Sequence, residues 1–244
     1  MMRALWSAAS GMKAQQDNMD VVAHNIANVN TFGSKKVRAE FQDLVYQNLR
    51  AAGAQSGADS QYPTGLAIGL GTRTAATQRI FTQGNLQSSG NPTDVAIQGE
   101  GFFRIEMPDG TIAYTRDGSF KLDQNRRLVT TDGYPLADGI TVDENAPSDS
   151  ITISGDGRVS CTPVGGTTTQ IGQIQVARFV NPAGLQAIGK NLFQTTQSSG
   201  EALESTPGEQ GAGTLTQGVV EVAEGLQGAC HAVARAPGAG RRAH

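Results

Sequence analysis

The first thirty residues carry a hydrophobic stripe at heptad spacing, formed by Leu5, Met12, Met19 and Ile26. Small residues flank the stripe, and polar or charged side chains occupy many of the other positions, among them Lys13, Gln15, Gln16, Asp17 and Asp20. This spacing predicts an amphipathic helix from about Arg3 to Asn28 whose polar side faces solvent. At 1.5 Å per residue such a helix is about 40 Å long, which is more than a helix covering a small sheet needs.

The residues that follow predict where this helix ends. Asn28 and Asn30 have side chains that compete for backbone hydrogen bonds, and Gly33 can adopt the left-handed conformation that closes a helix. Periodicity alone leaves two interpretations open: the helix packs on its own domain, or it packs against other helices. Trp6 is likewise either an interface anchor or a core residue.

From Thr93 onward the pattern changes to short alternating segments separated by Asp-Gly pairs, at positions 109, 117, 132, 138 and 156. Such pairs are strong hairpin signals. Between them, apolar residues that we expect to share a face alternate with polar ones: Phe103, Ile105 and Met107, then Ile112 with Tyr114, Phe120 with Leu122, and Ile151 with Ile153. We therefore predict an antiparallel β-domain with one buried face.

Residues 50–64 lack either period and are rich in Ala, Gly, Ser and Gln. This composition is typical of a linker in an isolated chain.

Composition narrows the function classes. The chain has 244 residues, of which 38% are hydrophobic and 17% charged, so it can bury a core in one or two domains. A net charge of -3 is not the footprint of a nucleic-acid-binding protein.

The N-terminus lacks the layout of a signal peptide, and no apolar run is long enough to span a membrane. Cys161 is expected to be a core thiol in a strand, because two cysteines are too few for a disulfide framework.

We find no residue constellation that supports catalysis, a cofactor or a metal. The histidines, His24, His231 and His244, have no Cys, Asp or Glu partners at metal-ligand spacing. Asp117 and Asp123 are explained by turns. The glycines near residue 70 lack the lysine and helix pattern of a phosphate loop. The sequence therefore predicts that the protein is not an enzyme.

Several blocks of the sequence resemble the flagellar rod and hook proteins, the axial components of the bacterial flagellum. At the N-terminus these are Leu5-Trp6, Ser10-Gly11-Met12, Asn18-Met19-Asp20-Val21, Asn25 to Thr31, and Arg38 to Leu44. Further along the chain they are Asp94 to Phe103, Tyr114 to Phe120, and Leu128 to Tyr134. Within the family, the stretch Tyr46 to Gly71, the block Thr196 to Gly200 and the glycines after Ser205 resemble the distal rod members most. The resemblance covers about residues 1–222.

The resemblance implies a mixed, mainly β fold with a long, coiled-coil-like N-terminal helix and an antiparallel β-rich domain of the rod and hook type. The boundaries that we expect are 1–45 for the helical rod segment, 46–71 for an extended assembly stretch or linker, 72–222 for the β-rich domain and 223–244 for a divergent tail. In the distal rod members, the stretch that corresponds to residues 50–64 is associated with extra contacts between stacked subunits that stiffen the tube.

The tail departs from the family pattern. Members have a long C-terminal amphipathic helix that pairs with the N-terminal one. After Val222 this chain instead becomes rich in Gly, Ala, Pro and Arg, and its glycines and proline oppose a helix. The family's C-terminal helix is thus expected to be missing or disrupted. A reading-frame change near residue 222 is our hypothesis, and translating the neighbouring frames of the coding DNA tests it.

The resemblance further implies a structural subunit of the distal rod that self-assembles into a rigid hollow shaft and transmits motor torque to the hook. The implied partners are copies of the chain, proximal rod proteins, the hook protein, basal-body ring proteins and the export apparatus. The implied location is the flagellar basal body, between periplasm and outer membrane, reached without a cleaved signal peptide. The residues expected at the assembly interface are Leu5, Met12, Met19, Ile26, Asn25, Asn28 and Asn30.

Three alternatives stay open at this point. The chain could be a hook or proximal rod protein of the same family, or a monomeric β-rich binding module of the periplasm or cell exterior. An enzyme acting on cell-wall polymer ranks last, because it would need a cleft with perturbed carboxylates.

Overall fold

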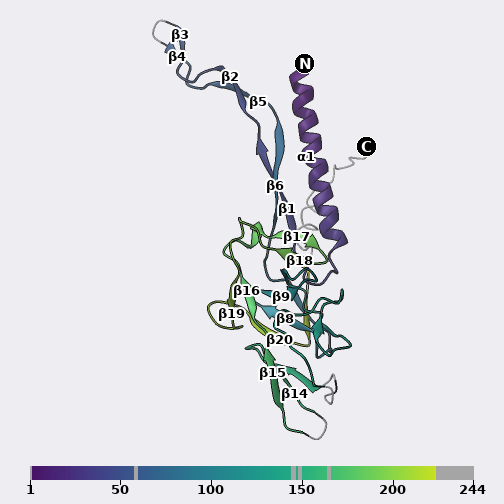
Figure 1. Ribbon diagram of the computed structural model, residues 1–244. Helices are drawn as coiled ribbons and strands as arrows, with labels where there is room; N and C mark the ends of the chain where they lie inside the picture. Colours follow the sequence, from purple (N-terminus) through teal and green to yellow (C-terminus); the bar gives the residue numbers. More distant parts are fainter. Residues whose placement is uncertain (1, 58–59, 144–146, 148–149, 164–165, 224–244) are drawn as a thin grey trace, which may run out of the picture. The chain divides into compact units, whose positions relative to one another are not determined.

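The computed structural model describes residues 2–57, 60–143, 147, 150–163 and 166–223. The chain divides into two compact units. Unit 1 consists of Met1–Ala27 and Val37–Ile80, and unit 2 consists of Asn28–Lys36 and Phe81–His244. Among the described residues the structure is mainly β with one long N-terminal α-helix, as predicted (Figure 1). The expected loss of the family's C-terminal helix falls on residues 224–244, which lie outside the described part.

Unit 1 begins with helix α1, Met2–Ala27. Alanine and methionine are the most frequent residues of this segment, and both have high helix propensity. The helix ends at Ala27 because the chain turns there, with the Thr31 amide donating to the Asn28 carbonyl at 3.1 Å. Gly33 is left-handed as predicted, with φ 66°, but it lies beyond this turn and does not close the helix. Its conformation instead allows close approach to the Asp117 backbone, where a Cβ would lie 2.4 Å from the amide nitrogen.

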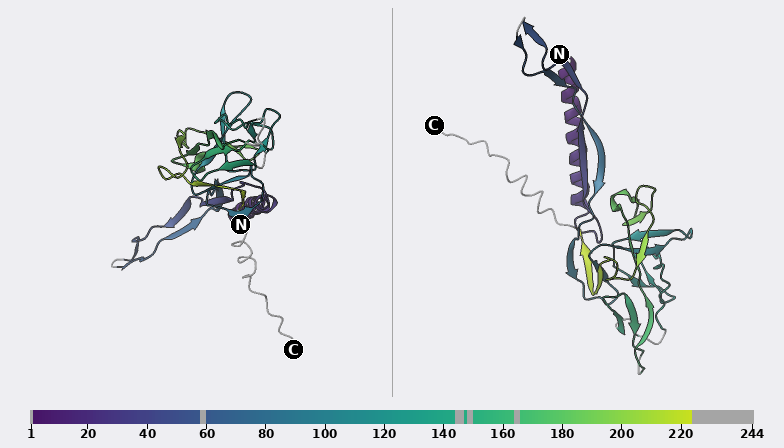
Figure 2. Two further views of the ribbon diagram at one scale, coloured as in Figure 1. Left: turned by 90° about the horizontal axis from the view of Figure 1, so that it is seen from below. Right: turned by 90° about the vertical axis from the view of Figure 1, so that its left-hand side faces the viewer.

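The rest of unit 1 is a long two-stranded antiparallel ribbon in which three strand pairs follow one another. The pairs are β1 (Val37–Asp43) with β6 (Thr72–Arg79), β2 (Tyr46–Arg50) with β5 (Leu66–Gly69), and β3 (Gln55–Gly57) with β4 (Ser60–Gln61). The stretch with linker-like composition therefore carries strand pairing. Its strands show no alternation in the sequence because neither of their faces is buried in unit 1. Figures 1 and 2 show α1 running alongside β1 and β6.

Unit 2 is organised around a six-stranded sheet in the order β17-β18-β10-β9-β16-β19. These strands are β17 (Gln186–Gly189), β18 (Leu192–Gln194), β10 (Ile112–Thr115), β9 (Phe102–Glu106), β16 (Val176–Arg178) and β19 (Leu203–Ser205). A 3-10 turn, η2 (Pro182–Gly184), precedes β17. All the pairings in this sheet are antiparallel, as predicted.

Shorter strand pairs complete unit 2. They are β7 (Asn85–Ser88) with β21 (Val219–Val222), β8 (Val95–Gln98) with β20 (Thr214–Gln217), β11 (Lys121–Leu122) with β12 (Leu128–Val129), and the three-stranded sheet of β13 (Ile151–Ile153), β14 (Arg158–Cys161) and β15 (Thr169–Gln173). Cys161 is fully buried in β14, which confirms the prediction of a core thiol.

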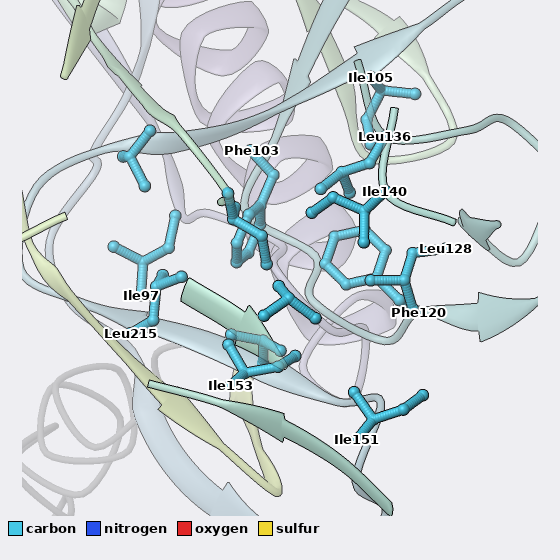
Figure 3. Packing of buried hydrophobic residues seen from close by; sticks show 14 of the residues in the cluster. Ile97, Phe103, Ile105, Phe120, Leu128, Leu136, Ile140, Ile151, Ile153 and Leu215 are labelled. Carbon is cyan, nitrogen blue, oxygen red and sulfur yellow. The ribbon is translucent and has the colours of Figure 1, made fainter. Parts of the chain in front are cut away.

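The prediction of one buried face is wrong, because the central sheet is covered on both faces. Phe103 and Ile105 belong to the main hydrophobic cluster, whereas the adjacent Phe102 belongs to a second cluster with Tyr114 and others. Figure 3 shows the main cluster, with side chains from several strands gathered around Phe103. Ile112, which the alternation pairs with Tyr114, is exposed near the turn. The second face could not be predicted from a local pattern, because the residues of the second cluster, most of them aromatic, come from segments that are distant in sequence.

The Asp-Gly signals are partly informative. Gly110 and Gly157 have positive φ in the turns that join β9 to β10 and β13 to β14, as hairpins require. The pair at Asp117-Gly118 is not a hairpin turn, because it leads from β10 to a strand of another sheet. Gly118 is needed there for space, since a Cβ would lie 1.6 Å from the Val95 carbonyl oxygen.

Candidate assembly surface

Helix α1 packs on the ribbon of unit 1 through small and polar side chains. Ala14 is the one buried residue of this helix, at 6% exposure, among the residues that the structure describes. Ser10 Oγ accepts a hydrogen bond from the Thr72 amide at 3.3 Å, and Thr74 donates its hydroxyl hydrogen to the Asp17 carboxylate. Asp17, expected to face solvent, is therefore half-buried and holds the ribbon. This face is too polar to be found by hydrophobic periodicity.

The opposite side of α1 is the heptad stripe of the sequence. Leu5, Met12, Met19 and Ile26 are 68%, 69%, 64% and 53% exposed, respectively. Trp6 is also exposed, so it is not a core residue of this chain. The first sequence interpretation thus holds for the polar face, which packs within unit 1. The apolar stripe has no cover in unit 1, and its packing against other helices stays a prediction. Unpartnered apolar surface of this extent marks an interaction site.

The three asparagines predicted at the helix end have different environments. Asn25 holds the first residue of β1, donating from Nδ2 to the Val37 carbonyl at 2.8 Å and accepting from the Val37 amide at 2.9 Å. Asn28 is half-buried, and its side-chain oxygen accepts from the Thr31 hydroxyl at 3.4 Å. Asn30 is exposed. The structure thus gives Asn25 and Asn28 local roles in the turn. That the seven residues expected at the assembly interface take part in assembly stays a prediction.

The ribbon carries a second exposed apolar surface, which sequence reasoning missed. Along β1, β2, β5 and their connections it includes Phe41, Val45, Tyr46, Leu49, Leu66, Ile68 and Leu70. These residues lie on both faces of a two-stranded ribbon, so they show no single periodicity. A two-stranded ribbon is marginally stable alone, and apolar side chains on it gain stability only when something covers them. The one available signal was the presence of these large apolar residues in a stretch that reads as a linker.

A buried charge cluster lies in unit 2 and joins segments that are far apart in sequence. The Glu221 carboxylate contacts Lys35 Nζ at 2.6 Å and Arg116 Nε at 3.0 Å, and the three side chains are at most 4% exposed. Burial by itself would raise the pKa of Glu221, but the charges of Arg116 and Lys35, with hydrogen bonds from Lys35 and the Gly84 amide, hold that pKa below its ordinary value. None of these residues was singled out by the sequence, because nothing local marks a buried ion pair.

The described residues offer little for chemistry. They include no group of His, Cys, Asp and Glu suited to a metal ion, and no helix long and apolar enough to cross a membrane. A cavity of about 60 Å³ in unit 2 is lined by aromatic rings, including Phe81, Phe102 and Phe179, and by the Arg178–Glu100 pair. This volume suits a few water molecules and not a polymer substrate.

Two family descriptions match the chain where these features lie. Residues 5–35 match the family described as flagella basal body rod protein, which covers most of α1 and the segment after it. Residues 96–161 match the family described as flagellar hook protein FlgE/F/G D1 domain, from β8 to β14. These two regions of the chain are therefore similar to structural proteins of the flagellar rod and hook.

Individual relatives narrow this class. The flagellar basal-body rod protein FlgG of Borreliella burgdorferi is 53% identical over 91% of this chain and 84% of the relative. That of Caulobacter vibrioides is 47% identical over 90% of this chain and 84% of the relative. The flagellar hook protein FlgE of Helicobacter pylori is 36% identical over 80% of this chain but only 28% of the relative. The chain belongs to the FlgG family of flagellar basal-body rod proteins, the distal rod proteins, which are structural and not enzymes.

Proposed function

We propose that this distal rod subunit assembles with copies of itself through the exposed stripe of α1, so that the helices pack around a common axis. The resulting shaft is rigid and hollow, and it transmits motor torque to the hook. The single observation that carries this proposal is the exposure of Leu5, Met12, Met19 and Ile26 on a helix whose other face is already engaged.

The energetics favour many weak contacts. Burying one Leu, Met or Ile side chain contributes about 1.5–3 kcal/mol at most, and ordering the partners offsets part of this gain. Four positions per helix therefore hold a subunit in place only when the contact repeats along an assembly. This is the pattern expected of a structural filament and not of a tight dimer.

The ribbon provides the second contact surface of the proposed assembly. Its apolar residues from Phe41 to Leu70 are exposed. The family resemblance associates residues 50–64, which lie within this ribbon, with contacts between stacked subunits. A ribbon held by neighbours on both faces would bend less than one held at a single end. We therefore assign it to stiffening the shaft.

The partners and the place of action follow from the family. Proximal rod proteins and the hook protein would adjoin the two ends of the distal rod, and basal-body ring proteins would surround it. The subunit would leave the cell through the flagellar export apparatus without a cleaved signal peptide, and it would act between periplasm and outer membrane. The names of the relatives, basal-body rod protein and hook protein, support this placement.

The divergent tail alters the proposal in one respect. Because residues 223–244 lack the amphipathic pattern that relatives use to cover the N-terminal helix, this chain should associate more weakly and stay monomeric more readily than its relatives. The reading-frame hypothesis for residue 222 onward remains part of this proposal, and resequencing the 3′ end of the gene tests it.

Met19→Asp tests the proposed stripe. The full chain should associate increasingly with concentration in sedimentation velocity, whereas the Met19→Asp variant should stay monomeric because its charge would be buried in the contact. Trp6 is the only tryptophan of the chain, so its emission reports on the same helix. The β-domain should unfold at the same denaturant concentration in both proteins.

Lys13→Gln is the matched control, because it changes the net charge by the same amount at an exposed position about 120° around the helix from Met19. It should associate like the unmodified chain. Should the full chain and a chain lacking residues 1–30 both stay monomeric at every concentration, the proposal fails and a monomeric binding module becomes the better account.

A further inference from the structure

The buried charge cluster of Lys35, Arg116 and Glu221 ties together three segments of unit 2. Lys35 lies in the link Asn28–Lys36, which follows α1 in the chain. Arg116 follows β10 of the central sheet, and Glu221 lies in β21, close to the last described residue. The same strand also holds the link through its backbone, since the Gly33 amide donates to the Glu221 carbonyl at 2.9 Å and Phe32 forms an antiparallel bridge with Val222.

Each charged group of the cluster is also hydrogen-bonded to backbone. The Gly84 amide donates to Glu221 Oε1 at 2.6 Å, and Lys35 Nζ donates to the Thr82 carbonyl at 2.7 Å. Arg116 Nη1 donates to the carbonyls of Gly99 and Gly101 at 2.8 and 2.7 Å. The carboxylate is thus held from the link, from the segment before β7 and from the central sheet.

Glu221 is the acidic group that both cations of the cluster share, since Lys35 and Arg116 each form an ion pair with its carboxylate. Removal of Lys35 would leave the pair of Arg116 and Glu221 in place. Removal of the Glu221 charge would take this shared ion pair from both buried cations, which is less favourable in a site of low dielectric.

The link and β21 are also separate from the main hydrophobic cluster, which draws no residue from residues 28–36 or from β21. Their attachment depends on the charge cluster, on backbone hydrogen bonds that include the pairing of β21 with β7, and on the buried side chain of Val220. A segment with few apolar contacts can open locally while the core stays folded.

We propose that Glu221 is a latch that holds the link Asn28–Lys36 and the terminal strand β21 in place together, so that they are ordered or released as one element. The latch acts on the segment through which the chain passes from α1 to the β-domain. Glu221 precedes the divergence after Val222, so this chain keeps the latch whatever its tail does. The inference concerns the monomer and does not depend on the proposed assembly.

Hydrogen exchange of the full chain, followed by mass spectrometry, tests the latch with the variant Glu221→Gln. Peptides that cover residues 28–36 and 219–222 should exchange about a hundredfold to a thousandfold faster than in the unmodified chain, because removing one partner of a buried ion pair favours local opening by this order. Peptides from β9 and β10 should keep their protection. Lys35→Met, which preserves the Arg116–Glu221 pair, should accelerate the same two segments by a smaller factor.

Glu204→Gln is the matched control, since Glu204 makes an ion pair with Arg104 at 3.0 Å but is 44% exposed. Its exchange should equal that of the unmodified chain. Unchanged protection of residues 28–36 in Glu221→Gln would overturn the latch, and so would release of β21 without the link. If Glu221→Gln does not fold, Lys35→Met decides: acceleration confined to the two segments supports the latch, and uniform acceleration across unit 2 contradicts it.

Discussion

Unit 1 and unit 2 use apolar residues in opposite ways. In unit 2 the apolar side chains of β8, β9 and β12 to β16 converge on shared clusters, and residues such as Phe103 and Val159 have no exposure. In unit 1 the helix buries Ala14, while its large apolar residues and those of the ribbon face outward. The β-domain is therefore stable by its own packing, whereas the helix and ribbon present surface for which the described chain has no cover.

This contrast separates two reasons for a residue to be apolar. In a closed core, apolar residues lower the free energy of the monomer by leaving water. The exposed apolar residues of α1 and the ribbon add little to the stability of the monomer, and in the proposed assembly they would leave water only on contact with a neighbour. Truncating a large apolar side chain should therefore lower the free energy of unfolding of the monomer strongly in unit 2 and only slightly in unit 1.

The largest effect is expected from Phe103→Ala in unit 2. Phe103 is fully buried, and its ring lies 5.1 Å from the Phe120 ring in an edge-to-face contact. The truncation should lower the free energy of unfolding by about 3–5 kcal/mol, measured by urea denaturation with far-ultraviolet circular dichroism. The counterpart in unit 1, Trp6→Ala, removes a larger but 74% exposed side chain and should change the value by less than about 0.5 kcal/mol. Equal losses would refute the contrast.

Acid should weaken unit 2 by a smaller amount, through Glu221. Because the folded-state pKa of Glu221 lies below its ordinary value of 4.5, its contribution to stability is complete above pH 4.5 and declines as the pH falls through the folded pKa. The charged groups that face it are Lys35 and Arg116. The difference in unfolding free energy between the unmodified chain and Glu221→Gln should therefore shrink as the pH falls below about 4.5. A difference independent of pH would contradict this assignment.

Glycine-to-alanine substitutions should change stability in opposite directions in the two units. Gly118→Ala would place a Cβ 1.6 Å from the Val95 carbonyl oxygen, so the backbone must shift and unit 2 should lose about 1–3 kcal/mol. Gly11 lies within α1, and a Cβ added there would have no atom of a neighbouring segment within 4 Å, so Gly11→Ala should stabilise the helix by up to about 1 kcal/mol. Thermal unfolding followed by circular dichroism would report both. A destabilised Gly11→Ala monomer would show that α1 is more closely packed than described.

Much of the fold was predictable because it follows local rules. The length and polarity of α1 come from residue propensity and heptad spacing, and the hairpins at Gly110 and Gly157 come from turn chemistry. The resemblance to flagellar rod and hook proteins rests on residue blocks that need no structure to be read. The exposed stripe of Leu5, Met12, Met19 and Ile26 was predicted as an apolar seam, although whether it meets copies of the chain is a proposal.

Other features could not be predicted because they join residues that are distant in sequence. The second buried face of the central sheet combines Phe102, Phe179 and Phe193 from three strands or loops. The nested pairing of the ribbon places Gln47 opposite Ile68 across a long excursion of the chain. The ion pair of Lys35 with Glu221 spans 186 positions.

The sequence by itself determined the family, the helix with its apolar stripe, and the antiparallel character of the β-domain, since each depends on periods or motifs of a few residues. Only the tertiary structure decided which apolar residues are covered and which are not, and which charges share a buried site. Burial and charge pairing depend on where distant segments meet, and local patterns carry no information about that meeting.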